Sequence, residues 1–197
     1  SDKLVLSSGY YFNNTRNKGW ALHLYDDWTD GFSTEFAYSD SSFHKDRGPL
    51  VGGFQPDVTV ATEFGGPEVQ FGTEYSSQSN ILDVQTQNAA FSGRWYLGDH
   101  VLKAGVDYQN DKFYNLFLQN SVGSYVFDSI DDFRNQRASS FAYGNAVPSL
   151  VPEDAAANYK YQSYAFGIMD AWQVTPNLTV NYGARYDLWG MADHPAL

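Results

Sequence analysis

The sequence predicts an all-β fold built from antiparallel hairpins, and three observations support that prediction. Several long runs alternate between apolar and polar residues, which is the period of two that a strand shows and a helix does not. Short turn-forming stretches separate many of these runs. Aromatic residues make up 17% of the 197 residues, while charged residues make up only 18%. An antiparallel sheet with one aromatic, apolar face and one polar face accounts for all three observations.

The segment 159–189 shows the alternation most clearly and reads as a strand, a turn at 175–177 and a returning strand. Pro176 in the turn can preset the bend. One face of the returning strand is apolar or aromatic, with Leu178, Val180, Tyr182, Ala184, Tyr186 and Leu188. The first strand matches it with Tyr164, Phe166, Ile168, Trp172 and Val174, and Asp170 is the exception on that face. Such a hairpin fits either a half-buried soluble sheet or a barrel wall with lipid outside and water inside.

The other alternating runs bring the expected number of strands to seven. They lie near 3–14, 19–28, 31–42, 81–97, 100–118, 160–174 and 178–190. Each has the nine to eleven residues that a tilted strand needs to cross a bilayer. A short connection at 17–19 separates the first two strands, and the Asp-Gly pair at 30–31 is a strong hairpin signal between the next two. A turn at 98–100 joins the fourth strand to the fifth.

Two long connections, at about 43–79 and 119–158, separate the strands at the ends opposite these turns. The first contains alternating runs around Gly65-Gly66-Pro67 and predicts a small hairpin of its own. In the second, Ser129 stands three residues before Asp132, which predicts a capped short helix. Long loops that carry their own secondary structure are usually functional.

A tryptophan precedes each of the three short turns: Trp28, Trp95 and Trp172. Short turns at one end, long loops at the other and tryptophans beside the turns predict a transmembrane outer-membrane β-barrel wall with periplasmic turns, extracellular loops and an interfacial aromatic girdle. The charged residues that fall on the non-lipid face by phase are expected to line a polar lumen: Arg94, Lys103, Asp107, Arg185 and Asp187.

Composition excludes several function classes. The net charge of −11 argues against binding nucleic acid, because a phosphate backbone needs a basic surface. The absence of cysteine excludes disulfides, zinc–thiolate sites and thiol catalysis. His23, His44, His100 and His194 are scattered and form no ligand pair in the sequence. We therefore predict no catalytic residues, no cofactor and no metal, and a role other than that of an enzyme.

Seven up-and-down strands would leave the two ends of the wall on opposite sides, whereas bacterial barrels have an even number of strands, and open edges cannot lie in lipid. The chain is therefore expected to be either a small complete barrel with one strand not recognised, or a partial β-barrel domain over residues 1–197 within a larger wall. A soluble, lectin-like β-sandwich that binds ligands is the alternative from another class.

Two segments, 100–135 and 152–188, resemble the barrel of TonB-dependent outer-membrane receptors, and the Oar-like branch is the nearest likeness. The resemblance depends on the pattern F-x-x-D-x-W-x-V followed by a turn and L-T-x-x-x-G-x-R-Y-D. The matching residues are Phe166, Asp170, Trp172 and Val174, whose spacing departs slightly from the pattern, and Leu178, Thr179, Gly183, Arg185, Tyr186 and Asp187.

This resemblance implies a full receptor with a plug domain, a TonB box and a 22-stranded barrel, of which the chain matches the middle of the barrel. It also implies uptake of a solute across the bacterial outer membrane. The implied partners are outer-membrane lipid and lipopolysaccharide, the plug domain and TonB through the full-length receptor, and an unknown solute ligand. A small complete barrel with a structural, adhesive or pore role stays open as the second hypothesis.

Overall fold

A computed structural model describes residues 2–191 of the chain and is all-β apart from one short α-helix in that range. His194 and the terminal residues 195–197 lie outside the described residues. The chain divides into two compact units. Unit 1 comprises Ser1–Arg16, His44–Asp83 and Tyr114–Asn158, and unit 2 comprises Asn17–Phe43, Val84–Phe113 and Tyr159–Leu197. No helix among the described residues is long and apolar enough to cross a membrane.

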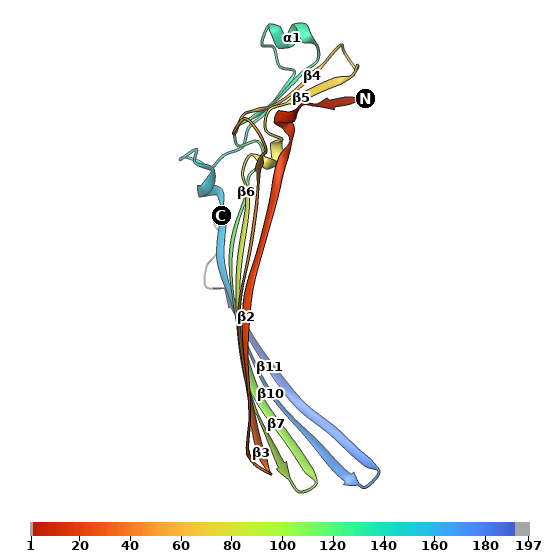
Figure 1. Ribbon diagram of the computed structural model, residues 1–197, viewed down its shortest axis with the longest axis vertical. Coiled ribbons are helices and arrows are strands. Elements are labelled where there is room, and N and C mark those ends of the chain that lie inside the picture. The colour runs from red at the N-terminus through yellow and green to blue at the C-terminus, as the bar shows by residue number, and fades with distance from the viewer. Residues whose placement is uncertain (1, 192–197) are drawn as a thin grey trace. The chain divides into compact units, whose positions relative to one another are not determined.

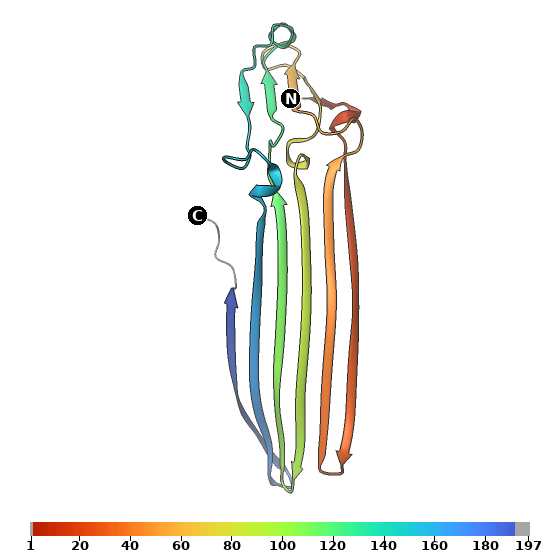
Figure 2. The same cartoon turned by 90° about the vertical axis from the view of Figure 1, so that its left-hand side faces the viewer.

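Six long strands form one up-and-down sheet in the order β11-β10-β7-β6-β3-β2 (Figures 1 and 2). They are β2 (Tyr11–Thr29), β3 (Phe32–Pro49), β6 (Asn80–Leu97), β7 (His100–Phe117), β10 (Ala157–Thr175) and β11 (Leu178–Met191). The sheet is open among the described residues, with β2 and β11 at its edges. The all-β prediction is confirmed, and a closed barrel is not observed.

The prediction of seven strands is not confirmed, because the end of the first expected strand and the whole of the second form one strand, β2. β2 runs without a break through residues 17–19, where a turn was expected. Gly19 packs closely against β3 instead: a Cβ added there would come within 3.3 Å of the Ser41 Cβ. A glycine inside a strand can serve such a close approach as readily as a turn. Residues Lys3–Val5 form β1, a strand of another sheet.

All three predicted tight turns are confirmed, and each has two residues between its strands. They are Asp30-Gly31, Gly98-Asp99 and Pro176-Asn177. Gly98 has φ of +65°, a left-handed conformation in which a side chain would be strained. Short turns of this kind fix the register of the hairpins that they close.

The β10–β11 pairing confirms the predicted phase of the hairpin. Phe166 lies opposite Tyr186, and Ile168 lies opposite Ala184, so these apolar side chains share one face. Gly167 lies opposite Arg185 on the other face. A shift of one residue would exchange the two faces completely.

Unit 1 contains a smaller five-stranded sheet in the order β1-β5-β4-β8-β9. Its strands are β1 (Lys3–Val5), β4 (Asp57–Ala61), β5 (Glu68–Phe71), β8 (Ser124–Phe127) and β9 (Ser140–Ala142). The antiparallel β4–β5 pair is the hairpin predicted around residues 65–67. β4 pairs with β8 in parallel, which the sequence did not predict.

The short helix predicted after Ser129 is α1 (Ile130–Arg134). The Ser129 hydroxyl accepts a hydrogen bond of 3.0 Å from the backbone N–H of Asp132, as an N-cap does. Three short 3₁₀ turns complete the described chain: η1 (Ser7–Gly9), η2 (Tyr75–Ser77) and η3 (Pro152–Ala155).

Candidate functional site: the two faces of the unit 2 sheet

The part of the six-stranded sheet that lies in unit 2 is called the unit 2 sheet. Its apolar face has no second layer of protein over it among the described residues. Phe166 is 47% exposed, Tyr186 is 63% exposed and Ile168 is 51% exposed. Monomeric soluble proteins rarely leave a large contiguous apolar patch in water, because each Å² costs about 25 cal/mol. A face of this kind requires lipid or another apolar partner.

The apolar face occupies only part of each long strand. On β2 it extends from Trp20 to Trp28, with Asp26 as a charged exception, which is the nine-residue length that a tilted strand needs to cross a bilayer. Beyond this band the same face becomes polar. Gln87 donates to the Asp40 carboxylate at 2.8 Å, Asn110 donates to the Gln87 carbonyl at 3.2 Å, and Gln162 donates to the Asn110 carbonyl at 3.4 Å.

These four residues form a polar ladder across β3, β6, β7 and β10. Polar side chains cannot face hydrocarbon without a large cost. The ladder therefore marks one limit of the face that lipid can cover. The strands are 18 or 19 residues long in β2, β3, β6, β7 and β10, about twice the length of the band.

The three predicted tryptophans all lie beside the short turns. The Trp28 indole N–H donates to the Thr34 hydroxyl at 2.9 Å, which keeps it paired in an apolar setting. Trp95 stacks on Phe32 with 5.1 Å between ring centroids. Trp172 stacks on His100 at 5.6 Å. Their place at the membrane interface stays a prediction.

A second group of aromatic rings lies at the other end of the band, which the sequence reasoning missed. Trp20 and Tyr38 are 5.2 Å apart, and Tyr108 and Tyr164 are 4.9 Å apart. The signal was available, because Trp20 and Trp28 share one face and stand eight residues apart. Aromatic girdles at both limits of an apolar band are a feature of transmembrane barrels.

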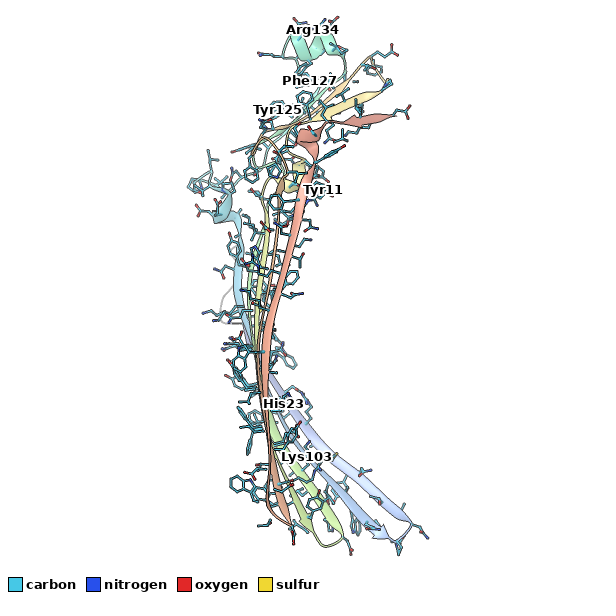
Figure 3. All side chains as sticks on the ribbon, in the orientation of Figure 1. Tyr11, His23, Lys103, Tyr125, Phe127 and Arg134 are labelled. Carbon is cyan, nitrogen blue, oxygen red and sulfur yellow. The ribbon has the colours of Figure 1, made fainter. Side chains whose placement is uncertain are left out.

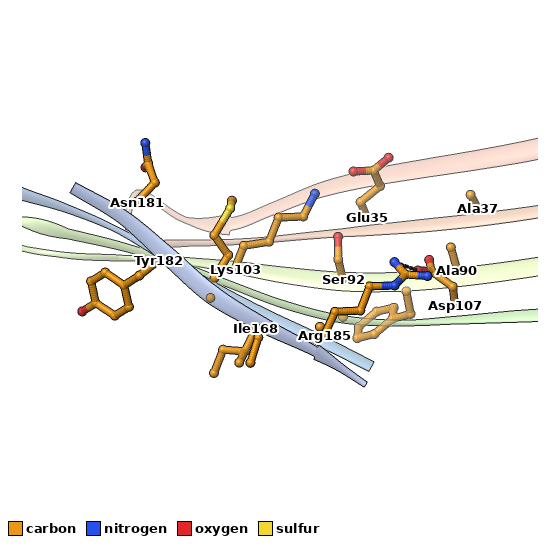
Figure 4. A pocket seen from close by; sticks show the side chains of 16 residues that line it. Glu35, Ala37, Ala90, Ser92, Lys103, Asp107, Ile168, Asn181, Tyr182 and Arg185 are labelled. Carbon is orange, nitrogen blue, oxygen red and sulfur yellow. Dashed lines mark ion pairs between the residues drawn. The ribbon is translucent and has the colours of Figure 1, made fainter. Parts of the chain in front are cut away.

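The opposite face of the unit 2 sheet is polar and carries charges of both signs. A hollow of about 670 Å³ lies over it, lined by Lys103, Asp107, Arg185 and Glu35 among others (Figure 4). The Arg185 guanidinium is 3.5 Å from the Asp107 carboxylate and 2.9 Å from that of Asp187. These residues are exposed, so each pair contributes at most about 1 kcal/mol to stability in water.

Four of the five residues predicted to line a lumen are therefore close together: Lys103, Asp107, Arg185 and Asp187. The fifth, Arg94, lines a neighbouring hollow of about 290 Å³ together with Lys103 and Asp27. Gly167 lies opposite Arg185 on the intervening strand β10, and a Cβ there would meet open space. Arg185 on β11 can thus reach across β10 to Asp107 on β7.

A family model described as "Outer membrane beta barrel domain" matches residues 11–194. The chain belongs to this family. An outer membrane barrel domain is located in the bacterial outer membrane, and one lipid-facing and one water-facing side are what its wall requires. No curated protein and no solved structure matched the chain.

Asp170 is the charged residue on the apolar face of β10, and its carboxylate has two hydrogen-bonding partners. His100 Nδ1 lies 2.6 Å from the carboxylate, and the Tyr182 hydroxyl donates to the same oxygen at 2.6 Å. His100 also stacks on Trp172 with an interplanar angle of 7°. Charged side chains within a membrane are costly unless they are paired, and both partners of Asp170 contact Oδ2. Among the described residues the other oxygen, Oδ1, is buried without a hydrogen-bond partner, so the cluster offsets only part of the cost of this carboxylate.

The sequence was interpreted as giving no metal-ligand motif at the histidines, but two of them lie beside carboxylates in the structure. His100 contacts Asp170, and in unit 1 His44 lies 2.5 Å from Asp83 and 3.8 Å from Asp46. Sequence reasoning missed the long-range contacts because they depend on strand pairing. No group of three or more metal-ligating side chains that could hold a metal ion occurs within residues 2–191.

Proposed function

We propose that this barrel domain is part of the wall of a TonB-dependent receptor that takes up a solute across the outer membrane, with no catalytic step. The observation that carries the proposal is the sheet, which within residues 2–191 is open with β2 and β11 as unpaired edge strands. Unpaired backbone N–H and C=O groups cannot face lipid. Bacterial barrels have at least eight strands, so six long strands need further strands to complete a wall.

The polar face supports a transport role. Charges of both signs around Lys103, Asp107 and Arg185 make a surface that water can wet and that a plug domain could contact. The resemblance of 100–135 and 152–188 to TonB-dependent receptors favours a plugged barrel. In this proposal the loops 43–79 and 119–158 face outward and capture the solute, and TonB acts through the full-length receptor.

A small complete barrel with a structural, adhesive or pore role is the second candidate. The number of long strands among the described residues is equally consistent with it, because six is two short of the smallest bacterial barrels. Two further strands would then complete the wall, and neither a plug nor TonB would be needed.

Two measurements on the intact protein separate the candidates: chemical crosslinking in native outer membranes, and ion conductance after transfer to planar bilayers. The receptor proposal expects chemical crosslinking to the periplasmic domain of TonB and no steady ion conductance in planar bilayers, because a plug would close the lumen. A small barrel expects no crosslink to TonB. Steady conductance without any TonB crosslink would overturn the receptor proposal.

A further inference from the structure

The β8–β9 pair in unit 1 carries an aromatic surface that the transport wall does not need. Tyr125 lies opposite Phe141 in the antiparallel register, so both side chains project from one face of the small sheet. Their ring centroids are 4.7 Å apart. Phe127 follows Tyr125 two residues on along β8, so it lies on the same face, and the two rings are 6.5 Å apart and nearly parallel at 19°. Figure 3 labels both residues. Tyr143 extends the row from Phe141, with rings 6.3 Å apart and an interplanar angle of 8°.

These four residues, Tyr125, Phe127, Phe141 and Tyr143, are the aromatic platform. Phe141 is 57% exposed and Tyr143 is 50% exposed, whereas Phe127 is only 7% exposed. Phe133 of α1 packs edge-on against Phe127 at 5.2 Å. The platform is thus fixed from within the unit at one end and open to solvent at the other. The exposed rings of Phe141 and Tyr143 beside the fixed ring of Phe127 form an apolar patch of the kind that indicates a binding surface.

A cavity of about 560 Å³ continues from the platform into unit 1. Its walls include Tyr125, Phe127 and Phe133, and two amide side chains, Gln55 and Gln136, also line it. No Asp, Glu, Lys, Arg or His is among its lining residues. The volume is within the usual range for sites that bind small ligands, which combine apolar walls with a few polar groups.

We propose that the platform and its cavity bind an uncharged oligosaccharide. A pyranose ring has an apolar C–H face that can lie flat on an aromatic ring, and hydroxyls at its edge that amides and tyrosine hydroxyls can pair. The absence of charge in the lining disfavours an ionic ligand, since no counter-charge would replace its lost hydration. The chain's net charge of −11 further disfavours anionic glycans.

This inference rests on the proposed outward position of the loops for access to ligand, but binding itself does not require TonB. The solute that unit 1 captures is thereby assigned to the class of uncharged oligosaccharides. The platform residues lie in the loop 119–158, whose composition alone identified no ligand.

Isothermal titration of the intact protein tests the proposal, in a detergent without a sugar headgroup. The probes are cellohexaose and maltoheptaose as neutral chains, and hexagalacturonate as a charged chain. We expect saturable binding of at least one neutral chain and at least tenfold weaker binding of the charged one. Tyr125→Ala and Phe141→Ala should each weaken neutral binding about tenfold or more, since one stacked ring typically contributes this much.

Ring-preserving variants and a matched control keep the test decisive if an alanine variant disturbs folding. Tyr125→Phe and Phe141→Tyr should bind within a few-fold of the original protein. Phe64→Ala removes an aromatic side chain of the same unit that is 87% exposed and outside the platform, and should leave binding unchanged. The proposal is overturned if no neutral chain binds, if hexagalacturonate binds as tightly, or if Phe64→Ala weakens binding as much as the platform variants.

The two proposals fail separately. Neutral oligosaccharide binding by a protein that does not crosslink to TonB supports the platform and overturns only the receptor. A TonB crosslink without oligosaccharide binding does the reverse.

Discussion

A lysine at the middle of the apolar band tests whether lipid covers that face. Ile168 stands four residues from both Tyr164 and Trp172, which mark the two aromatic limits of the band on β10. Four residues of strand span about 13 Å, or about 9 Å along the membrane normal at a tilt near 45°. Ile168 would therefore lie near the bilayer midplane, where lysine on the lipid face costs about 2–4 kcal/mol.

Met169→Lys is the matched control for Ile168→Lys. Met169 is the next residue along β10, is 48% exposed against 51% for Ile168, and lies on the other face because successive residues of a strand alternate. Because water covers the face on which Met169 lies, Met169→Lys should change the free energy of unfolding by less than about 0.5 kcal/mol.

Urea unfolding of both variants in lipid vesicles measures the difference. We expect Ile168→Lys to lower the free energy of unfolding by about 2–4 kcal/mol relative to Met169→Lys. Equal effects of the two variants would refute the assignment of lipid to one face and water to the other.

Three further predictions follow from single residues. The chain has no cysteine, so an introduced cysteine is the only site that a maleimide can label. In outer-membrane vesicles a membrane-impermeant maleimide should label Lys18→Cys, which lies outside the apolar band, but not Leu24→Cys, which lies within it. Labelling of both variants would contradict the limits of the band. Burial raises the pKa of Asp57 above its usual 3.8. The protonated carboxyl group of Asp57 therefore stabilises the folded protein, and this contribution is lost as pH rises from 3.8 through the raised pKa. Urea unfolding should show that Asp57→Asn is more stable relative to the original protein at pH 7 than at pH 3.5, and the opposite trend would refute the assignment. The Arg47 guanidinium lies 2.7 Å from the Glu74 carboxylate, and both side chains are about four-fifths buried. Arg47→Ala should therefore lower the free energy of unfolding by about 3 kcal/mol, and a protease should cleave unit 1 faster. Unchanged cleavage would contradict a structural role of this pair.

Local patterns in the sequence predicted the hairpins of the long sheet well. The alternation from Leu178 to Leu188 and the turn at Pro176 specify both faces of β11, and the structure has the same phase. Gly19 misled the prediction because a glycine serves equally as a turn residue and as a point of close approach between strands.

The sheet of unit 1 could not be predicted in the same way. Its parallel β4–β8 pairing joins Asp57 to Ser124, which stand 67 positions apart in the sequence. Periodicity shows which side of a strand is apolar but not which distant strand is its neighbour. The aromatic platform depends on such pairing, since Tyr125 and Phe141 meet only when β8 and β9 are aligned.

The candidate site was predicted as a face but not as a set of contacts. Phase alone assigned Lys103, Asp107 and Arg185 to one side of the wall, and they do share a hollow. The ion pair between Arg185 and Asp107 additionally requires β10 to lie between β11 and β7. Strand order of this kind is not encoded in the alternation of any one strand.

The absence of a side chain at Gly167 has a mechanical consequence. Hydrogen bonds tie each strand only to its immediate neighbours, but the Arg185–Asp107 pair fastens β11 directly to β7 above that vacant position. A bulky residue there would be sterically tolerated by the backbone and would still sever this tie. The hairpin would still be hydrogen-bonded to β7 through β10, so a substitution at Gly167 is expected to loosen β11 only locally, by no more than the roughly 1 kcal/mol that an exposed ion pair contributes.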